Sequence, residues 1–463
     1  MTKLTALSLL VLLTAGCAVG PNYKRPSVNV PGTYRGVTPE EAAQPAAESL
    51  ANQKWWEVFQ DKQLQDLIHT ALQQNYDVRI AATRILQAEA QVGVTRADQL
   101  PTISAGAQAV NQRSARSKHF PPFETSANQV DLALAWELDF WGKYRRATEA
   151  ARANLLATEW AREAVISTLV SDVATAYFQL RALDLQLEIS RRTLASRQDS
   201  LRLTQMLANG GATSMLDVRQ AEQLVSTAAE TIPDLERRIE QQENFLSTLL
   251  GNNPGPIARG TKLTEQPHVP EIPAGLPSSL LERRPDIRAA EAQLIAANAQ
   301  IGVAKAAYFP QITLTGSSGF QSSALTSLFT GPAGLWSFGG SLVQPVFAGG
   351  RIRSTVKFTE ARQQEALLVY QQTIQQAFRG VSDALVEYRK DREFREQQQL
   401  ALSAQDAARL SDMRYRGGAA SYLEVLTNET NYFAAELGLA QAQLNELLGL
   451  VSIYRNLGGG WQQ

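Results

Sequence analysis

The chain has 463 residues, with 44 Lys and Arg against 45 Asp and Glu. A net charge of −1 argues against a nucleic-acid-binding protein, because such proteins carry a basic excess on their binding face. The single cysteine rules out an intrachain disulfide and a cysteine-based metal cluster, and no stretch reaches the roughly 18 apolar residues of a membrane-spanning helix. We therefore expect a large, water-exposed protein with no cofactor and no nucleic-acid partner.

The chain begins with the pattern of a secretory signal peptide over residues 1–16, where Lys3 precedes a short apolar run. Cys17 follows directly and resembles the lipidation site of a bacterial lipoprotein, although an ordinary signal peptide with an incidental cysteine gives the same pattern. The next residue is Ala18 rather than the aspartate that retains lipoproteins in the inner membrane, which favours the outer membrane. We expect residues 17–50, rich in Pro, Ala, Glu and Gln, to form a lipid-anchored tail.

The rest of the chain is a tandem duplication. Residues 90–104 and 299–313 are identical at seven of fifteen positions, at an offset of 209. Residues 209–218 match residues 416–425 at an offset of 207, so the offset is nearly constant along the chain. Such self-similarity indicates repeated structural units. We place the first repeat at residues 51–260 and the second at residues 261–463.

Each repeat predicts a helix, two strands, a very long helix, a Gly-Gly turn and a further helix. In the first repeat the long helix covers residues 143–209, which contain neither Gly nor Pro. At about 1.5 Å per residue it is a rod of roughly 100 Å. Leucines seven residues apart give it coiled-coil patterning; they are Leu180, Leu187, Leu194 and Leu201. The other expected helices cover residues 77–99, 214–250, 286–308 and 351–416.

The expected strands alternate between apolar and polar side chains. In residues 130–140 one face carries Val130, Leu132, Leu134, Trp136, Leu138 and Phe140 and the other is polar and acidic. This pattern fits a transmembrane barrel strand, or else a half-buried strand of a soluble sheet. Residues 101–109, 311–320 and 336–346 are weaker versions. Four strands cannot close a barrel alone, so an oligomer is required: two chains would supply eight strands and three would supply twelve.

Five motifs together resemble the TolC-like outer-membrane factors, in their branch of OprM/NodT-type efflux lipoproteins. They are residues 17–26, 55–59, 280–286, 296–302 and 457–461. The resemblance implies a mainly α fold with a β-barrel part, in which a homotrimer shares one 12-stranded barrel above a long α-helical tunnel. It further implies a passive exit duct in the outer membrane for drugs or small toxic compounds. Its partners would be a periplasmic adaptor, an inner-membrane transporter and outer-membrane lipid.

The resemblance places the periplasmic tip at the two Gly-Gly turns, which would also dock the adaptor. The turn residues are Gly210, Gly211, Gly417 and Gly418, since glycine accepts positive φ at little cost. Asp217 and Glu424 would form a ring of carboxylates around the opening, and Leu216 and Leu423 an apolar constriction. The alternative is that both acidic residues only favour their helix N-termini. Many relatives carry a second acidic residue where this chain has Thr427, which puts one acidic ring in doubt.

Two other classes of function compete with the duct. A lipid-anchored periplasmic coiled-coil adaptor or scaffold would explain the long helices and the anchor, but not the paired alternating strands. An enzyme is disfavoured, because the sequence holds no phosphate-binding loop, no dinucleotide fingerprint and no zinc-protease motif. Pro233 has Ala440 as its counterpart in the second repeat, so we expect it to kink or interrupt one helix only.

Overall fold

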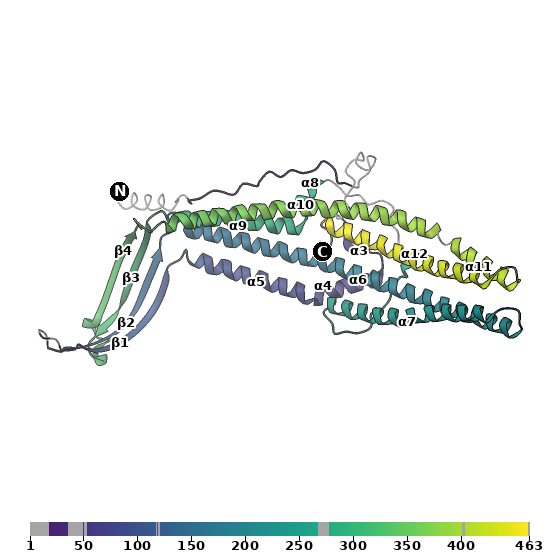
Figure 1. Cartoon of the computed structure of the whole chain (residues 1–463). Coiled ribbons are helices and arrows are strands. Elements are labelled where there is room, and N and C mark those ends of the chain that lie inside the picture. The colour runs from purple at the N-terminus through teal and green to yellow at the C-terminus, as the bar shows by residue number, and fades with distance from the viewer. Residues whose placement is uncertain are drawn as a thin grey trace. The chain divides into compact units, whose positions relative to one another are not determined.

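The computed structural model describes residues 18–35, 50, 53–116, 118, 121–266, 277–400 and 403–461. The expected signal peptide and Cys17 lie outside these ranges. Within them the chain is mainly helical, with one antiparallel sheet (Figure 1). None of the helices in these ranges is both long and apolar enough to cross a membrane.

The sheet has four strands in the order β1-β2-β3-β4, so that β1 and β4 are its two edges within the described part of the chain (Figure 1). The strands are β1 (Thr102–Arg113), β2 (Glu124–Glu137), β3 (Gln311–Ser322) and β4 (Gly334–Val343). The strand count is the expected one. β2 begins six residues before the expected start, where Glu124 pairs with Arg113. β4 ends at Val343, earlier than expected, close to Pro345, which has no backbone N–H for a ladder.

Large apolar side chains lie exposed on this sheet. Trp336 is 80% exposed, Phe338 is 72% exposed and Leu342 is 65% exposed, all at even-numbered positions of β4. Leu132 in β2 is 57% exposed. A monomeric soluble protein rarely exposes a contiguous apolar surface of this kind. The half-buried strand of a soluble sheet is therefore the weaker of the two interpretations.

Long helices make up most of the remainder. The expected helix over 143–209 is α6 with the same bounds, as the absence of Gly and Pro allows. The expected helix over 351–416 is described as α10 and α11, with residues 401–402 outside the description. The helices are α3 (Trp55–Val58), α4 (Lys62–Gln74), α5 (Tyr76–Ala97), α6 (Lys143–Asn209), α7 (Met215–Leu249), α8 (Pro277–Arg283), α9 (Pro285–Ala306), α10 (Arg351–Leu400), α11 (Ser403–Arg416) and α12 (Tyr422–Asn456).

Prolines set some helix ends and are tolerated elsewhere. α5 ends at Ala97 and α9 at Ala306, each four residues before the proline that follows, so both helices end slightly earlier than expected. Pro233 lies inside α7, which continues to Leu249. An interruption of the helix at Pro233, one of the two outcomes expected from the sequence, does not occur.

Two compact units divide the chain, and each takes segments from both repeats. The first unit comprises the described residues up to Ser27, Arg84–Glu159 and Ala289–Gln371, and it contains the sheet. Its helices α6 and α9 meet through small side chains, with Ala150 and Ala153 against Ala296 and Ala299. The second unit comprises Val28–Thr83, Trp160–Arg288 and Gln372–Gln463. In its core Ile189 of α6 packs against Phe433 and Ala440 of α12.

Candidate functional site: hairpin tips and the N-terminal strap

The first Gly-Gly turn joins α6 to α7, and we call these two helices with their turn the first hairpin. Gly210 N–H donates to Met206 O at 3.0 Å and Ala212 N–H donates to Leu207 O at 2.8 Å. These bonds satisfy carbonyls at the end of α6 that have no partner within the helix. Gly211 has φ of +75°, and Gly210 has no positive φ.

The second Gly-Gly turn joins α11 to α12 and repeats this geometry. We call these two helices with their turn the second hairpin. Gly417 N–H donates to Met413 O at 3.0 Å and Ala419 N–H to Arg414 O at 2.8 Å, while Gly418 has φ of +71°. All four glycines therefore lie in the tight reversals, as expected. The positive backbone angle is confined to the second glycine of each pair.

Asp217 lies in the first turn of α7, where the cap of the helix holds it. Its N–H donates to Ser214 Oγ at 3.4 Å, and Ser214 N–H donates back to its carboxylate at 3.3 Å. Thr213 Oγ1 also donates to the same carboxylate oxygen. This reciprocal arrangement is a capping box, so Asp217 does what the simpler interpretation requires. The residue is half-buried, and this cap is compatible with a further role at the opening.

Glu424 occupies the matching first turn of α12 with a different partner. Its carboxylate lies 3.1 Å from Arg414 Nη1 of α11, and its side chain is 37% exposed. The residue at the doubtful position, Thr427, donates its hydroxyl to Leu423 O at 2.9 Å and carries no charge. The second tip therefore has one acidic residue in this turn, and that residue is paired with an arginine.

The apolar residues expected at the opening are exposed in both tips. Leu216 is 65% exposed and Leu423 is 56% exposed, and Met215 beside the first of them is 60% exposed. Burying a leucine stabilises a protein by about 1.5–3 kcal/mol. These exposed leucines at equivalent positions of the two tips are therefore candidates for a contact with another copy of the chain or with a partner protein.

Two tyrosines join the two tips, and sequence reasoning missed both. Tyr415 and Tyr422 meet edge to face at 5.2 Å between ring centres and pack with Ala221 and Val425. The hydroxyl of Tyr415 lies 3.4 Å from Thr213 Oγ1 of the first hairpin. A signal was available, since Ala208 and Met215 stand at the equivalent positions of the first repeat.

The segment that follows Cys17 is held in a fixed path, and we call residues 18–25 the N-terminal strap. Val19 N–H donates to Trp141 O at 3.0 Å. The buried Arg146 donates to Val19 O at 3.3 Å, to Gly20 O at 3.4 Å and to Asn22 Oδ1 at 2.7 Å. The strap therefore begins beside the residues that connect β2 to α6.

Helix α9 supplies the other side of the strap's path. Asn298 donates to Pro21 O at 2.9 Å, and Glu291 receives both Tyr23 OH at 3.2 Å and Arg25 Nε at 3.1 Å. Close approach is allowed by Gly302, where a Cβ would lie 2.6 Å from Val19 O. The sequence predicted an extended tail but not the contacts that hold it, because these join residues more than 100 positions apart in the chain.

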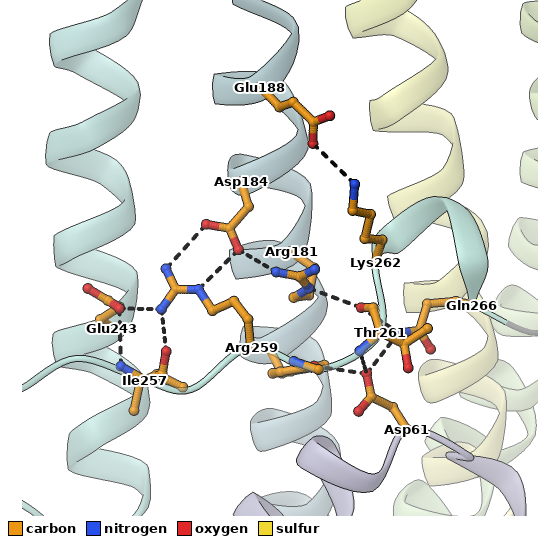
Figure 2. Close-up of polar contacts among 12 residues, drawn as sticks. Asp61, Arg181, Asp184, Glu188, Glu243, Ile257, Arg259, Thr261, Lys262 and Gln266 are labelled. Atoms are coloured by element: carbon orange, nitrogen blue, oxygen red, sulfur yellow. Dashed lines mark hydrogen bonds and ion pairs between the residues drawn. The ribbon is translucent and has the colours of Figure 1, made fainter. Parts of the chain in front are cut away.

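A buried polar network in the second unit fastens the joint between the repeats (Figure 2). Asp61 is 2% exposed, and its Oδ2 accepts from Tyr177 OH at 2.8 Å, Thr261 N–H at 3.0 Å and Gln266 Nε2 at 2.9 Å. Burial and the carboxylate of Asp61 raise the pKa of Tyr177 far above its usual range, so the phenol stays a proton donor.

The same joint is fixed to α6 and α7 by Arg259 (Figure 2). Its guanidinium lies 3.1 Å from Asp184 of α6 and also pairs with Glu243 of α7. Arg181 of α6 pairs with Asp184 at 2.7 Å and donates to Thr261 O at 3.1 Å. No motif in the sequence predicts this network, because its members come from four separate segments.

The described ranges contain no group of three His, Cys, Asp or Glu side chains that could hold a metal ion. Of the three histidines, His119 and His268 lie outside those ranges. His69 packs edge to face on Trp55 at 4.8 Å between ring centres, which is a packing role.

Comparisons with known proteins agree on one family. The family model described as outer membrane efflux protein matches residues 67–252 and 276–459. The toluene efflux pump outer membrane protein TtgC of Pseudomonas putida is 34% identical over 469 residues, covering 100% of this chain and 97% of that protein. The probable outer membrane lipoprotein SilC of Salmonella typhimurium is 36% identical over 466 residues, covering all of both chains. The solved outer membrane channel MtrE of Neisseria gonorrhoeae superposes with a TM-score of 0.87 at 31% identity, covering 96% of this chain and 99% of that one.

Proposed function

Because the chain belongs to the outer membrane efflux protein family and is an outer-membrane exit duct, we propose that its two hairpin tips form the gate of that duct. The observation that carries this proposal is the tip geometry. Equivalent turns at Gly211 and Gly418 each present an acidic residue in the first helical turn, with an exposed leucine beside it.

The working form of the duct is a homotrimer. Within the described ranges β1 and β4 each pair on one side only, and in lipid every backbone N–H and C=O must be bonded. Three copies supply twelve strands, which fits the range of bacterial barrels. The exposed apolar residues of β4, including Trp336 and Phe338, would then face lipid. Cross-linking of the protein in membranes should yield a species of three chains.

Around the threefold axis Asp217 and Glu424 would contribute six carboxylates. A ring of negative charge favours cations and repels anions. Asp217→Asn combined with Glu424→Gln should therefore reduce the cation preference of single channels. Both substitutions keep the size and polarity of the side chain, so the cap that residue 217 makes on α7 persists, while the ion pair of Glu424 with Arg414 is lost. Asp234→Asn is the matched control, because Asp234 is exposed on α7 and pairs with Arg237 of its own helix. Unchanged ion selectivity in the double variant would refute the ring.

The anchor of the duct is lipid on Cys17. Support comes from the strap, whose fixed path starts at the next residue, beside the connection from β2 to α6. The similarity to SilC, which is described as a lipoprotein, agrees with this. Mass spectrometry of the N-terminal peptide should find Cys17 as the first residue, carrying lipid. An unmodified Cys17, or a chain that still carries residues 1–16, would contradict the proposal.

The tips also dock a periplasmic adaptor that connects the duct to an inner-membrane transporter, and the cargo comprises drugs or small toxic compounds. TtgC, whose name specifies toluene efflux, supports an organic cargo. Deleting the gene should sensitise the host to such compounds. The competing function, a lipid-anchored scaffold, predicts release from membranes once the lipid is removed, whereas a barrel trimer still requires detergent.

A further inference from the structure

The two connections between paired strands lie at the end of the sheet away from the helices (Figure 1). Because the helices of this outer-membrane duct extend into the periplasm, these connections lie at the cell exterior. They differ in charge. Residues 311–350 contain no charged side chain, whereas residues 100–123 contain no acid and three cations, which are Arg113, Arg116 and Lys118. The cations therefore belong to the first repeat alone.

The hairpin of β1 and β2 extends further from the helices than the hairpin of β3 and β4. We call its described residues between positions 111 and 126 the β1–β2 arm. The pairing of β2 with β3 ends at Asn128 and Ser322, whereas β1 and β2 stay paired as far as Arg113 and Glu124. These four further steps add about 13 Å along the strand, or about 10 Å along the membrane normal at a tilt of about 40°. The polar layer of one leaflet is about 5–7 Å thick, so the arm passes through it.

Arg113 lies on the membrane side of the barrel wall and not on its channel side. Directly paired residues share a face of the sheet, so Leu132 lies with Ser318, and Ser318 with Trp336. The exposed apolar side chains on this face mark it as the one toward lipid. Side chains alternate between the two faces along a strand, so Glu124 and its partner Arg113 lie on the face of Leu132. The guanidinium is therefore at the height of the lipid headgroups.

The cations of the arm are accessible to a ligand. The side chain of Arg113 is 69% exposed, and the carboxylate of Glu124, 3.5 Å away, is 74% exposed. An ion pair this exposed contributes little to stability. Arg116 and Lys118 are exposed as well. Even with Glu124 counted, the arm of each chain has two more positive than negative charges.

Exposed apolar side chains accompany these cations at the outer end of the sheet. Phe123 is 61% exposed, Leu325 is 71% exposed and Phe329 is 70% exposed. Ser114 N–H donates to Phe123 O at 2.9 Å, so the two segments of the arm stay bonded beyond the last pair of the ladder. Aromatic side chains beside cations are typical of the boundary between a membrane and water.

We propose that the β1–β2 arm binds the phosphorylated headgroups of the outer leaflet, which in a bacterial outer membrane belong to lipid A. Guanidinium and ammonium groups bind phosphate through charge-assisted hydrogen bonds, and basic clusters at a membrane surface recognise anionic headgroups. The arm holds the barrel to the outer leaflet, on the opposite side of the membrane from the lipid on Cys17. The proposal rests on the trimeric barrel described above and is independent of the gate at the tips.

The test measures the affinity of purified, fluorescently labelled trimers for lipid A in detergent micelles. A variant that combines Arg113→Gln, Arg116→Gln and Lys118→Gln should bind lipid A at least tenfold more weakly, because each cation near an anionic headgroup adds to the affinity. Raising the salt concentration should weaken binding of the native protein and narrow this difference.

The matched control removes the same number of positive charges from the periplasmic helices. It combines Arg191→Gln, Arg237→Gln and Arg379→Gln, whose side chains are exposed and, like that of Arg113, each pair with an acidic residue. This variant has the same net charge as the arm variant, and we expect it to bind lipid A as the native protein does.

A second measurement uses native trimers and therefore does not depend on the assembly of any variant. Hydrogen exchange is followed with lipid A and with lipid A from which both phosphates have been removed. Peptides that cover residues 111–126 should exchange at least threefold more slowly with lipid A than with its dephosphorylated form. Peptides from the uncharged connection between β3 and β4 should exchange equally with both.

Three outcomes would overturn the proposal. They are native affinity in the arm variant, equal weakening in the arm variant and the control, and equal exchange of residues 111–126 with the two forms of lipid A. The gate at the tips is decided separately, because the ion selectivity of Asp217→Asn with Glu424→Gln does not depend on what the arm binds.

Discussion

Asp61→Asn tests the buried network at the joint between the repeats. The substitution keeps the size of the side chain and the N-cap of α4, where Oδ1 accepts from Gln63 N–H at 2.9 Å. It replaces Oδ2 by an NH₂ group that faces three donors. Gln266 and Tyr177 have side chains that can reorient, but the backbone N–H of Thr261 cannot. A buried N–H without an acceptor costs about 1–3 kcal/mol. Loss of the negative charge also weakens the remaining hydrogen bonds, so we expect the substitution to destabilise this part of the protein by about 2–4 kcal/mol in total.

Hydrogen exchange read by mass spectrometry measures this loss where it occurs. A cost of about 3 kcal/mol corresponds to roughly a hundredfold faster opening, so peptides that cover residues 257–266 should exchange at least 30-fold faster. Asp66→Asn, an exposed position on the same helix, should leave them unchanged. Equal exchange in Asp61→Asn and the native protein would show that the joint is held by something other than this carboxylate.

Two further predictions use matched pairs of positions. Gly211→Ala, at φ of +75°, should destabilise the first tip by about 1–2 kcal/mol. Gly210→Ala, where the new Cβ would lie 3.5 Å from Met206 O, should be neutral or stabilising; similar exchange rates in peptides around residue 211 for the two variants would contradict the turn geometry. Arg146→Gln should free the N-terminal strap and speed tryptic cleavage after Lys24, whereas Arg152→Gln on the exposed side of α6 should not. Equal cleavage rates in these two variants would mean that Arg146 does not hold the strap.

The elements that could be predicted are those whose pattern is local. The absence of Gly and Pro between residues 143 and 209 predicts α6 to the residue, and alternation locates all four strands. The start of β2 could not be predicted, because residues 124–129 are mostly polar and enter the ladder only by pairing with β1. The tight turns were predictable from paired glycines, but which glycine takes the positive angle depends on where the helix ends.

The residues that sequence reasoning missed act across long separations. Tyr415 is bonded to Thr213, 202 residues away, and Arg197 reaches the carbonyl of Leu224 and the ring of Phe433. The periodicity of a sequence predicts which face of a helix is apolar, but it does not predict which other helix that face will contact. Comparing the two repeats would have drawn attention to Tyr415, which stands where the first repeat has Ala208.

The pairing of β2 with β3 joins the two repeats, because β2 belongs to the first and β3 to the second. By the repeat, β3 is equivalent to β1 and β4 to β2. The seam between β4 of one chain and β1 of the next would then be a copy of the seam inside each chain. A closed ring of three chains would hold six such seams. Three of them, between β2 and β3, lie within one chain, and they alternate with three between β4 of one chain and β1 of the next. The pairing of Val130 with Phe320 is consequently a template for the register between neighbouring chains.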